Sequence, residues 1–522
     1  MFKNEPLTNF NSDASRETMN TSLAALERRI QHGALKACPI IGGEELHTGR
    51  ENKRFDPASN DVLVGTTELA GKGDMERALT LLHNRASSWA ATPARTRAEM
   101  LHTAARLMRQ RKFDLSALII RETGKPWREA DADVAEAIDF CDYYALEMLR
   151  LAAPHKTQEV TGEDNFYLYG ARGVCAVISP WNFPLAIACG MTVAALVAGN
   201  AVLLKPARQT SLIAFELCRI LLEAGVPPEV LAFLPSSGDE IGNALVESPL
   251  LDMICFTGSK AVGLDIIQRA SVVQPGQRNV KKVVAEMGGK NAVIVDEDAE
   301  LDDAVKLVAS SAFGFSGQKC SACSRLIVHQ SIYEQFIERL AQAASDLIIG
   351  KPSDPASFMG PVIDAAAQKR ILQIVEEAKL DTKLAFMGKA PEGGCFVPPV
   401  IFRDVAPSSR LWREEVFGPV LAVCSAENFE AALTRANDCE YALTGGVFSR
   451  NPAHIEMAKR NFMVGNLYIN RGCTGALVQR QPFGGSRMSG VGSKAGGPDY
   501  LLQFLDPRTV SENTMRRGFV AK

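Results

Sequence analysis

The sequence predicts an α/β protein with two domains, each built on an open, mostly parallel, doubly wound sheet. From residue 174 onward, short apolar runs alternate with helical segments, which is typical of β-α-β units whose sheet is covered on both faces. The chain has 522 residues, enough for two or three domains of ordinary size. The change from one sheet to the next is predicted near Gly288-Gly289.

Composition excludes some classes of function. The formal net charge is -3, with 57 basic and 60 acidic residues and no dense basic run, so binding to nucleic acid or an anionic membrane has no electrostatic footprint. The 12 cysteines lack the regular spacing of a disulfide framework, and the amino terminus lacks an apolar signal core. We therefore expect a cytoplasmic location. No histidine or cysteine pattern predicts a metal site.

The elements before residue 174 are mainly helical. Leu23, Leu26 and Ile30 recur at helical spacing and predict an appended helix over residues 22–30. A turn between short strands is expected at 55–60. Long helices are predicted at residues 74–88, 96–111 and 129–151.

The first predicted sheet follows. Its strands are expected at residues 174–179, 201–205, 230–235 and 253–257, with helices at 186–197, 212–224 and 241–247. Residues 185–204 carry no formal charge and are long enough to span a bilayer. Prolines break the entry to this stretch and glycines interrupt it, so a buried helix feeding a buried strand is the better interpretation.

The second predicted sheet has strands at residues 292–295, 325–328, 400–402, 420–423 and 466–469. Two segments fit neither sheet: residues 162–172, which are predicted as a projecting hairpin, and the tail 497–522. We expect them to pair with another subunit, the alternative being a mobile surface hairpin and tail. The predicted division is an extension at 1–45, a first domain at 46–160 and 176–287, a second at 288–490, and an association element at 161–175 and 491–522.

Cys320 is the candidate nucleophile. It lies in a loop of small residues, where a backbone can approach a reactant closely, and the neighbouring Lys319 is expected to favour the thiolate. Most cysteines in proteins are buried filler, so the loop alone does not establish catalysis. Cys323 completes a Cys-x-x-Cys pattern, but no second pair suggests a zinc site or a redox centre.

Two further residues could complete the chemistry. Asn182 lies between Pro180 and Pro184, and such a restrained backbone could aim its amide at an oxyanion; the alternative is that Asn182 caps a helix. Glu286 lies between a strand and a glycine pair, where a carboxylate can act as a general base for water.

The early strands are not followed by the G-x-G-x-x-G dinucleotide fingerprint. Ser259 lies where a strand meets a helix, so the helix start could bind pyrophosphate, or Ser259 could simply cap it. Lys205 ends a strand, where it could bind ribose hydroxyls or remain solvated. Glu415 offers a second carboxylate beside an aromatic ring.

Six motifs occur together in one order: Pro180-Trp181-Asn182-Phe183-Pro184, Lys205-Pro206-Ala207, Phe256-Thr257-Gly258-Ser259, Glu286-x-Gly288-Gly289-Lys290, Gly317-Gln318-x-Cys320 and Glu415-x-Phe417-Gly418-Pro419. In this combination the chain resembles the NAD(P)-dependent aldehyde dehydrogenase superfamily over residues 40–510. Within it, the segments at 312–325, 474–485 and 493–500 resemble the 1-pyrroline-5-carboxylate dehydrogenases, which oxidise L-glutamate gamma-semialdehyde.

The resemblance implies a fold with a Rossmann-like NAD(P)-binding domain at 46–160 and 176–287 and a catalytic domain at 288–490. It implies that Cys320 attacks the aldehyde, Asn182 stabilises the oxyanion and Glu286 activates water for thioester hydrolysis. Lys205 would bind the adenosine ribose, Ser259 the pyrophosphate and Glu415 the nicotinamide ribose. The full set expected to bind the cofactor is Ile178, Ser179, Trp181, Lys205, Ala207, Arg208, Gly258, Ser259, Glu415 and Phe417.

The substrate residues come from the same resemblance. Gly475 and Ala476, helped by Ser321, would anchor the substrate's carboxylate and amino group, and Phe183 and Phe483 would enclose its aliphatic part. The implied reaction is oxidation of L-glutamate 5-semialdehyde to L-glutamate in proline degradation. Alternatives are another semialdehyde, such as succinate semialdehyde, or a catalytically silent binding protein with this fold.

Arg208 departs from the acidic residue that many NAD-preferring relatives carry after Lys-Pro-Ala or Lys-Pro-Ser. An arginine there could pair with a 2′-phosphate, so we expect NAD as the cofactor with measurable use of NADP. A homo-oligomer, a dimer or larger, is also expected.

Overall fold

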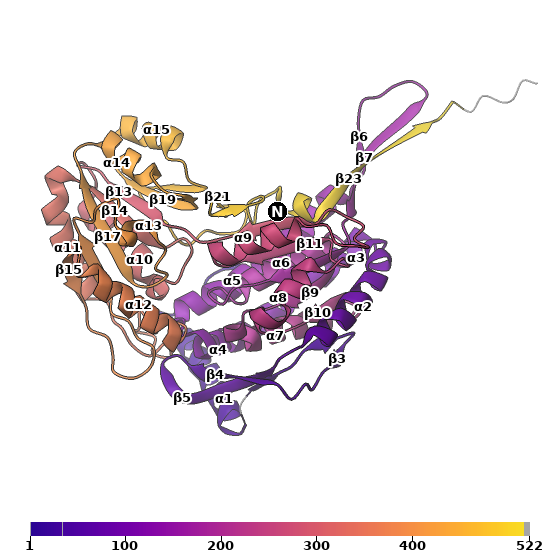
Figure 1. The fold of residues 1–522 in the computed structure, drawn as a ribbon, viewed down its shortest axis with the longest axis horizontal. Coiled ribbons are helices and arrows are strands. Elements are labelled where there is room, and N and C mark those ends of the chain that lie inside the picture. Colours follow the sequence, from indigo (N-terminus) through magenta and orange to yellow (C-terminus); the bar gives the residue numbers. More distant parts are fainter. Residues whose placement is uncertain (1, 34, 516–522) are drawn as a thin grey trace, which may run out of the picture.

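The structure is a computed structural model in which residues 2–33 and 35–515 are described. Two α/β lobes lie side by side, and a narrow sheet projects away from both (Figure 1). The predicted class, α/β with two open sheets, is confirmed.

The first lobe is built on an eight-stranded sheet in the order β22-β12-β11-β8-β9-β10-β2-β3. Its five middle strands are parallel, whereas β2, β3 and β22 join antiparallel. The strands are β2 (Ile40–Ile41), β3 (Glu44–Glu45), β8 (Val174–Ile178), β9 (Ala201–Lys205), β10 (Leu231–Phe233), β11 (Met253–Thr257), β12 (Lys282–Glu286) and β22 (Gly490–Val491).

Helices cover this sheet on both faces (Figure 1). They are α2 (Lys72–Ala90), α3 (Ala94–Gln110), α4 (Lys112–Thr123), α5 (Trp127–Ala152), α6 (Ala186–Val197), α7 (Ser211–Glu223), α8 (Gly238–Glu247) and α9 (Lys260–Ala270). The sequence reasoning missed α4. Most of this helix is buried, so it lacks the polar face that makes helical periodicity visible.

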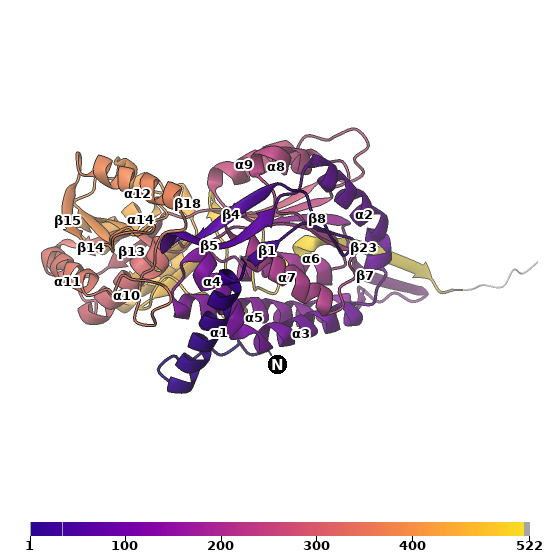
Figure 2. The same ribbon diagram turned by 90° about the horizontal axis from the view of Figure 1, so that it is seen from below.

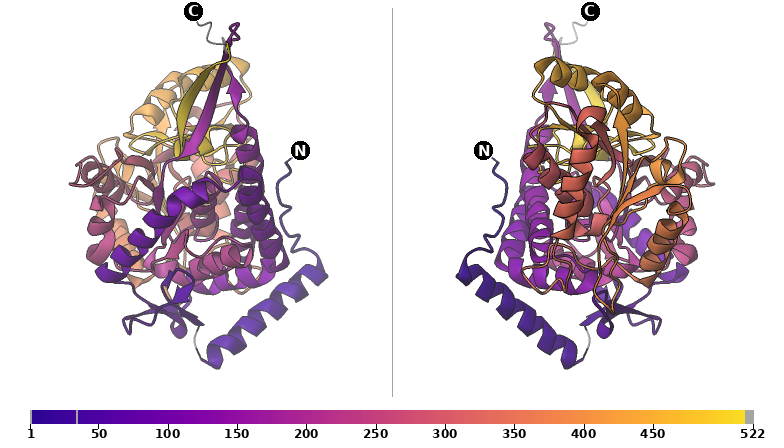
Figure 3. Two further views of the ribbon diagram at one scale, coloured as in Figure 1. Left: turned by 90° about the vertical axis from the view of Figure 1, so that its right-hand side faces the viewer. Right: turned by 90° about the vertical axis from the view of Figure 1, so that its left-hand side faces the viewer.

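The amino-terminal helix is longer than predicted. It is α1 (Asp13–Gln31), which packs against α4 at the end of the molecule opposite the projecting sheet (Figure 3). The turn expected at 55–60 is present, because β4 (Glu51–Asp56) and β5 (Ser59–Glu68) form an antiparallel pair that β1 (Leu35–Ala37) extends.

The second lobe contains a seven-stranded sheet in the order β15-β16-β17-β14-β13-β19-β20. It is parallel except for the edge strand β15. The strands are β13 (Asn291–Val295), β14 (Cys323–His329), β15 (Lys383–Met387), β16 (Val400–Arg403), β17 (Val420–Ala426), β19 (Thr444–Phe448) and β20 (Asn466–Ile469). The helices are α10 (Leu301–Phe313), α11 (Tyr333–Ser345), α12 (Ala365–Ala378), α13 (Arg410–Arg413), α14 (Phe429–Asn437) and α15 (Pro452–Asn461).

The sequence reasoning also missed β19, a strand inside this sheet. Its Gly445-Gly446 pair is typical of a loop, yet both glycines are buried. A Cβ at Gly445 would come within 2.6 Å of the ring of Phe462. These glycines therefore allow close packing of a helix end against the sheet and do not mark a turn.

The hairpin predicted at 162–172 has other bounds: its two strands run from His155 to Ala171, and residues 162–172 supply only the second of them. The second strand is β7 (Glu163–Ala171), which pairs along its whole length with β23 (Leu505–Asn513) and near its middle with β6 (His155–Lys156). The three strands form the sheet that projects from the body (Figure 2). The predicted tail is thus partly a strand, and its residues 516–522 lie outside the described part.

Residues 185–204 divide into α6 and β9, as expected. Among the residues that the structure describes, no helix combines the length and the hydropathy needed to cross a membrane.

Candidate active site

The carboxyl ends of four neighbouring strands bring predicted site residues together at one edge of the first sheet. The ladder pairs Ile178 with Lys205 and with Phe256, and pairs Thr257 with Glu286. Strand order reverses here, because β9 and β10 lie on one side of β8 while β11 and β12 lie on the other. Such a switch point is the usual ligand site of an open parallel sheet.

The loop that carries Cys320 has an unusual backbone. Phe315, Ser316 and Gly317 all have positive φ, at 50°, 55° and 68°. A Cβ at Gly317 would lie 2.3 Å from the carbonyl oxygen of Gly418, so only glycine fits there. The buried Gln318 side chain accepts from the backbone N–H of Ile363 at 2.8 Å and holds the loop in place.

The residues around the glycine pair hold the backbone of Cys320. Asn291 Nδ2 donates to the carbonyl oxygen of Cys320 at 2.7 Å and to that of Ala322 at 2.9 Å. A Cβ at Gly289 would approach the Cys320 carbonyl oxygen to 2.6 Å. The segment around Gly288-Gly289, where the chain passes from the first sheet to the second, therefore also holds the loop that carries Cys320.

Asn182 lies beside this loop. Its buried side-chain amide donates to the carbonyl oxygen of Gln318 at 3.2 Å. The helix that follows begins at Ala186, with Leu185 at its N-cap position, so Asn182 is not a helix cap. The rings of Trp181 and Phe417 meet edge to face with centroids 5.4 Å apart, which brings two predicted cofactor residues together across the lobes.

Glu286 ends β12 and is partly buried. Burial raises the pKa of its carboxyl group to about 8, against an opposing effect of the Lys494 ammonium. Burial raises the pKa of the Cys320 thiol, and the Glu286 carboxylate raises it further, so the charge of Glu286 acts on the thiol.

The expectation for Lys319 needs correction. Its ammonium is paired with Glu129 Oε1 at 2.6 Å, on helix α5, so its charge is compensated. Burial and nearby carboxylates hold the pKa of Cys320 well above its ordinary value. These surroundings therefore favour the thiol over the thiolate.

The Glu415 side chain leaves no room for a Cβ at Gly288 and binds the backbone of Gly289. Its Oε1 accepts from the backbone N–H of Gly289 at 3.0 Å, and a Cβ at Gly288 would lie 2.0 Å from Oε2. Burial raises the pKa of Glu415 to about 7.

The other predicted cofactor residues lie along the strand-end edge. Lys205 is buried, its ammonium makes no hydrogen bond or ion pair with the described residues, and burial lowers its pKa to about 8. Ser259 is exposed and accepts from Val262 N at 3.4 Å, so it does cap α9. Ser179 N donates to Lys205 O at 3.1 Å, and Gly258 N donates to Glu286 O at 3.0 Å. Arg208 is exposed just beyond the half-buried Ala207.

The predicted substrate residues come from separate loops. Ser321 follows the nucleophile and is buried, and its carbonyl oxygen accepts from Thr444 Oγ1 at 3.1 Å. Gly475 has a φ of 76° with open space beside it, and Ala476 is half-buried. Phe183 and Phe483 are both half-buried.

A charged cluster on α5 escaped the sequence reasoning. Lys125, just before the helix, is fully buried, pairs with Asp133 at 2.7 Å and lies 3.7 Å from the centroid of Phe183. Glu129, Asp133 and Glu136 follow at helical spacing and could have indicated one acidic face directed inward.

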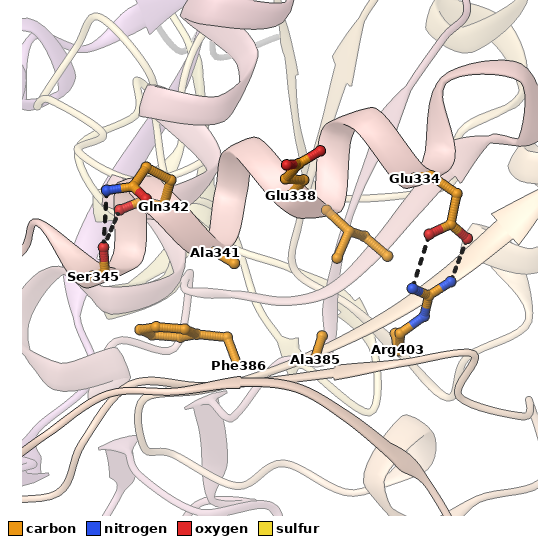
Figure 4. Close-up of a pocket in the computed structure, with 9 residues that line it drawn as sticks. Glu334, Glu338, Ala341, Gln342, Ser345, Ala385, Phe386 and Arg403 are labelled. Carbon is orange, nitrogen blue, oxygen red and sulfur yellow. Dashed lines mark hydrogen bonds and ion pairs between the residues drawn. The ribbon is translucent and has the colours of Figure 1, made fainter.

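A groove of about 520 Å³ lies elsewhere, between α11 and β15 (Figure 4). Arg403 and Glu334 form an ion pair at one end of it. None of the predicted site residues lines this groove.

Comparisons with known proteins identify one family. The model of the aldehyde dehydrogenase family matches residues 46–510. The chain is 47% identical to a 1-pyrroline-5-carboxylate dehydrogenase of Geobacillus thermodenitrificans, over 98% of this chain and 99% of that protein.

Two solved structures superpose on all or nearly all of this chain. A Thermus 1-pyrroline-5-carboxylate dehydrogenase with bound NAD superposes with a TM-score of 0.96 and 43% identity, over 98% of this chain and 99% of that one. A proline utilization A protein from Bdellovibrio bacteriovorus gives a TM-score of 0.98 and 48% identity, with all of this chain covering 54% of that longer one.

Proposed function

The chain belongs to the aldehyde dehydrogenase family, and from this premise we propose that it oxidises L-glutamate 5-semialdehyde, the open form of 1-pyrroline-5-carboxylate, to L-glutamate. The observation that carries the proposal is the identity of 47% with a 1-pyrroline-5-carboxylate dehydrogenase across nearly the whole chain. The convergence of Asn182 and Glu286 on the Cys320 loop supports it.

The proposed first step is covalent capture. Cys320 sulfur bonds to the aldehyde carbon while the thiol proton passes to solvent water, and the resulting oxyanion is stabilised by the Asn182 amide and the Cys320 backbone N–H. In the structure Asn182 donates to the Gln318 carbonyl oxygen, so the amide lies against the loop that presents the sulfur.

The last step is hydrolysis of the thioester. Glu286 accepts a proton from water, whose oxygen attacks the acyl carbon; L-glutamate leaves, and the Cys320 sulfur regains a proton. A carboxylate whose pKa is raised to about 8 is a stronger base than an ordinary glutamate once it is ionised.

We propose NAD as the cofactor, held by the ten residues predicted above. The fit is supported by the buried Lys205 ammonium, which lacks a partner among the described residues, and by its place beside the strand switch point. When bound, NAD accepts the hydride that converts the thiohemiacetal to a thioester. The exposed Arg208 supports some use of NADP.

The substrate's polar head is proposed to bind at Ser321, Gly475 and Ala476, with Phe183 and Phe483 around its aliphatic chain. The left-handed backbone and open space at Gly475 support a loop whose amides can reach a carboxylate.

The domain roles are part of the proposal. Residues 46–160 and 176–287 would bind the cofactor, and 288–490 would carry the nucleophile. The projecting β6-β7-β23 sheet is proposed to join subunits into a homo-oligomer. Its outer strand β23 leaves a row of backbone N–H and C=O groups that can pair with a strand of another subunit. The cytoplasmic location stays a prediction.

The test is to incubate the purified protein with pyrroline-5-carboxylate and NAD and follow the absorbance of reduced cofactor. A parallel series uses succinate semialdehyde, and each is repeated with NADP. No rise in absorbance with pyrroline-5-carboxylate would sink the proposal, and a much higher kcat/KM for succinate semialdehyde would replace the substrate.

A further inference from the structure

Lys494 lies near the candidate site in a loop that the proposed mechanism does not use. Its Nζ donates to Gly465 O at 2.6 Å, to Asn466 Oδ1 at 2.8 Å and to Gly484 O at 2.9 Å. The three acceptors use all three N–H bonds of an ammonium, so its position is determined by neighbours from two other segments.

The same contacts clamp the loop that carries Phe483. Ala495 N donates to Phe483 O at 2.7 Å, and Phe483 N donates to Ala495 O at 2.9 Å. Asn466 Oδ1 also accepts from Gly484 N at 3.4 Å. The Lys494-Ala495 pair therefore ties the 483–484 segment to the end of the second sheet.

Gly484 separates Lys494 from Glu286. A Cβ built on Gly484 would lie 3.2 Å from Glu286 Oε1 and 3.4 Å from both Cα and Cγ of Lys494. The aliphatic part of Lys494 and the Glu286 carboxylate thus pack on the same glycine, so a movement of Gly484 caused by one side chain also changes the surroundings of the other.

Lys494 is also the basic group that acts on Glu286. Within the described part of the chain, the other titratable groups that interact with Glu286 are acidic: Glu136, Tyr144, Cys255, Cys320 and Tyr500. The ammonium of Lys494 opposes the effect of burial on this carboxylate.

We propose that Lys494 is a positioning residue for Glu286: it clamps the Phe483–Gly484 segment beside the carboxylate and supplies the positive charge that favours its base form. The inference rests on the proposed function, because it assigns Glu286 the activation of water. Its effect therefore belongs to thioester hydrolysis and not to the capture of the aldehyde.

The test compares Lys494→Met with Lys494→Arg. Lys494→Met removes the charge, so the acidic limb of the steady-state pH–rate profile moves to higher pH by on the order of one unit, and the rate below the limb falls about tenfold. The initial burst of reduced cofactor persists, and a thioester on Cys320 accumulates, as seen by mass spectrometry. Lys494→Arg keeps the charge and leaves the limb near its original pH.

Lys459→Met is the matched control, because Lys459 is an exposed lysine paired with Glu456 on α15. Its profile and burst should equal those of the parent. Melting curves show which variants fold. If Lys494→Met does not fold, Lys494→Arg decides the outcome. An acidic limb that moves by about one pH unit in Lys494→Arg would contradict the inference, because the charge is retained there. A higher KM with an unmoved limb in Lys494→Met would overturn it, since Lys494 would then only hold the loop.

Measuring the same variants on propanal separates the two proposals. A parent that oxidises propanal but not glutamate semialdehyde would overturn the proposed substrate, while the limb measured on propanal would still decide the role of Lys494.

Discussion

At the residue scale, burial dominates the ionisation of the acidic groups in the candidate site. It raises the pKa of Glu286 to about 8 and that of Glu415 to about 7, and it holds that of Cys320 well above its ordinary value. Each shift has the same cause, because a low-dielectric surrounding disfavours the charged form. The site therefore favours the thiol form of Cys320. The nearby Glu286 carboxyl group, in contrast, ionises close to the pH at which enzymes commonly operate.

The raised pKa of Glu286 predicts a pH dependence. The base form is the deprotonated one, so the steady-state rate should rise with pH to a midpoint near 8 and be lost as the pH falls below it. Glu286→Gln should lower the steady-state rate by about 10²- to 10⁴-fold while the first turnover still forms a thioester. Steady-state and stopped-flow assays across pH check both; an unchanged profile in Glu286→Gln would exclude Glu286 as the base.

Arg208 predicts cofactor choice. Its exposed side chain carries positive charge at the end of β9, near Lys205, where a 2′-phosphate could pair with it. Arg208→Glu should lower kcat/KM for NADP about tenfold and leave that for NAD within about twofold. Initial rates with both cofactors measure this, with Arg208→Lys as the control that keeps the charge. Equal NADP kinetics in Arg208→Glu and the parent would remove the argument.

At the scale of elements, α5 fixes the position of the segment that carries Asn182 and Phe183. Asp133 on this helix accepts from the backbone N–H of Ala186 at 2.7 Å and pairs with Lys125, whose ammonium lies over the ring of Phe183. One buried ion pair thereby links the start of α5, the start of α6 and the segment that carries Asn182 and Phe183.

This pair predicts a large effect on stability. Lys125→Met leaves Asp133 buried without its partner, which should cost about 3–5 kcal/mol and lower the melting temperature. The double variant Lys125→Met/Asp133→Asn should recover part of the loss, because asparagine keeps an acceptor for Ala186 N without the charge. Thermal unfolding of the parent, both single variants and the double variant gives the answer; additive losses would show that the two side chains are not coupled.

At the scale of the whole molecule, segments far apart in the sequence form the projecting sheet. β7 and β23 pair from Ala171 with Leu505 to Glu163 with Asn513. The half-buried aromatic residues Phe166, Tyr167 and Tyr169 lie on β7 and leave apolar surface available for a second subunit.

The sheet predicts the behaviour of the oligomer. Val510 pairs with Phe166 near the middle of the ladder, so Val510→Pro should break the strand and shift the protein to a smaller species in light scattering after gel filtration. Val510→Thr, which keeps the N–H and the β-branch, should leave the species unchanged. A Val510→Pro protein of parental size would rule out the sheet as the subunit contact.

Much of the fold follows from local patterns in the sequence. The parallel strands of the first sheet are short apolar runs bounded by glycine and proline, so β8, β9 and β11 lie within a residue or so of their predicted positions. β19 and α4 were missed because their local pattern is dominated by packing: glycines serve contact in one, and burial on all sides hides the period in the other. The partner of β7 could not be predicted, since strand pairing across such a separation leaves no local signal.

The sequence alone determined which chemical groups are present and where they stand on the chain: a thiol in a small-residue loop, an amide between prolines, and carboxylates at strand ends. Only the tertiary structure decided what those groups experience. It placed Glu129 against Lys319, Lys494 beside Gly484 and Glu286, and Cys320 in a setting that favours its thiol. The reason is physical: the identity of a side chain is local, whereas its ionisation depends on desolvation and on charges brought in by distant segments.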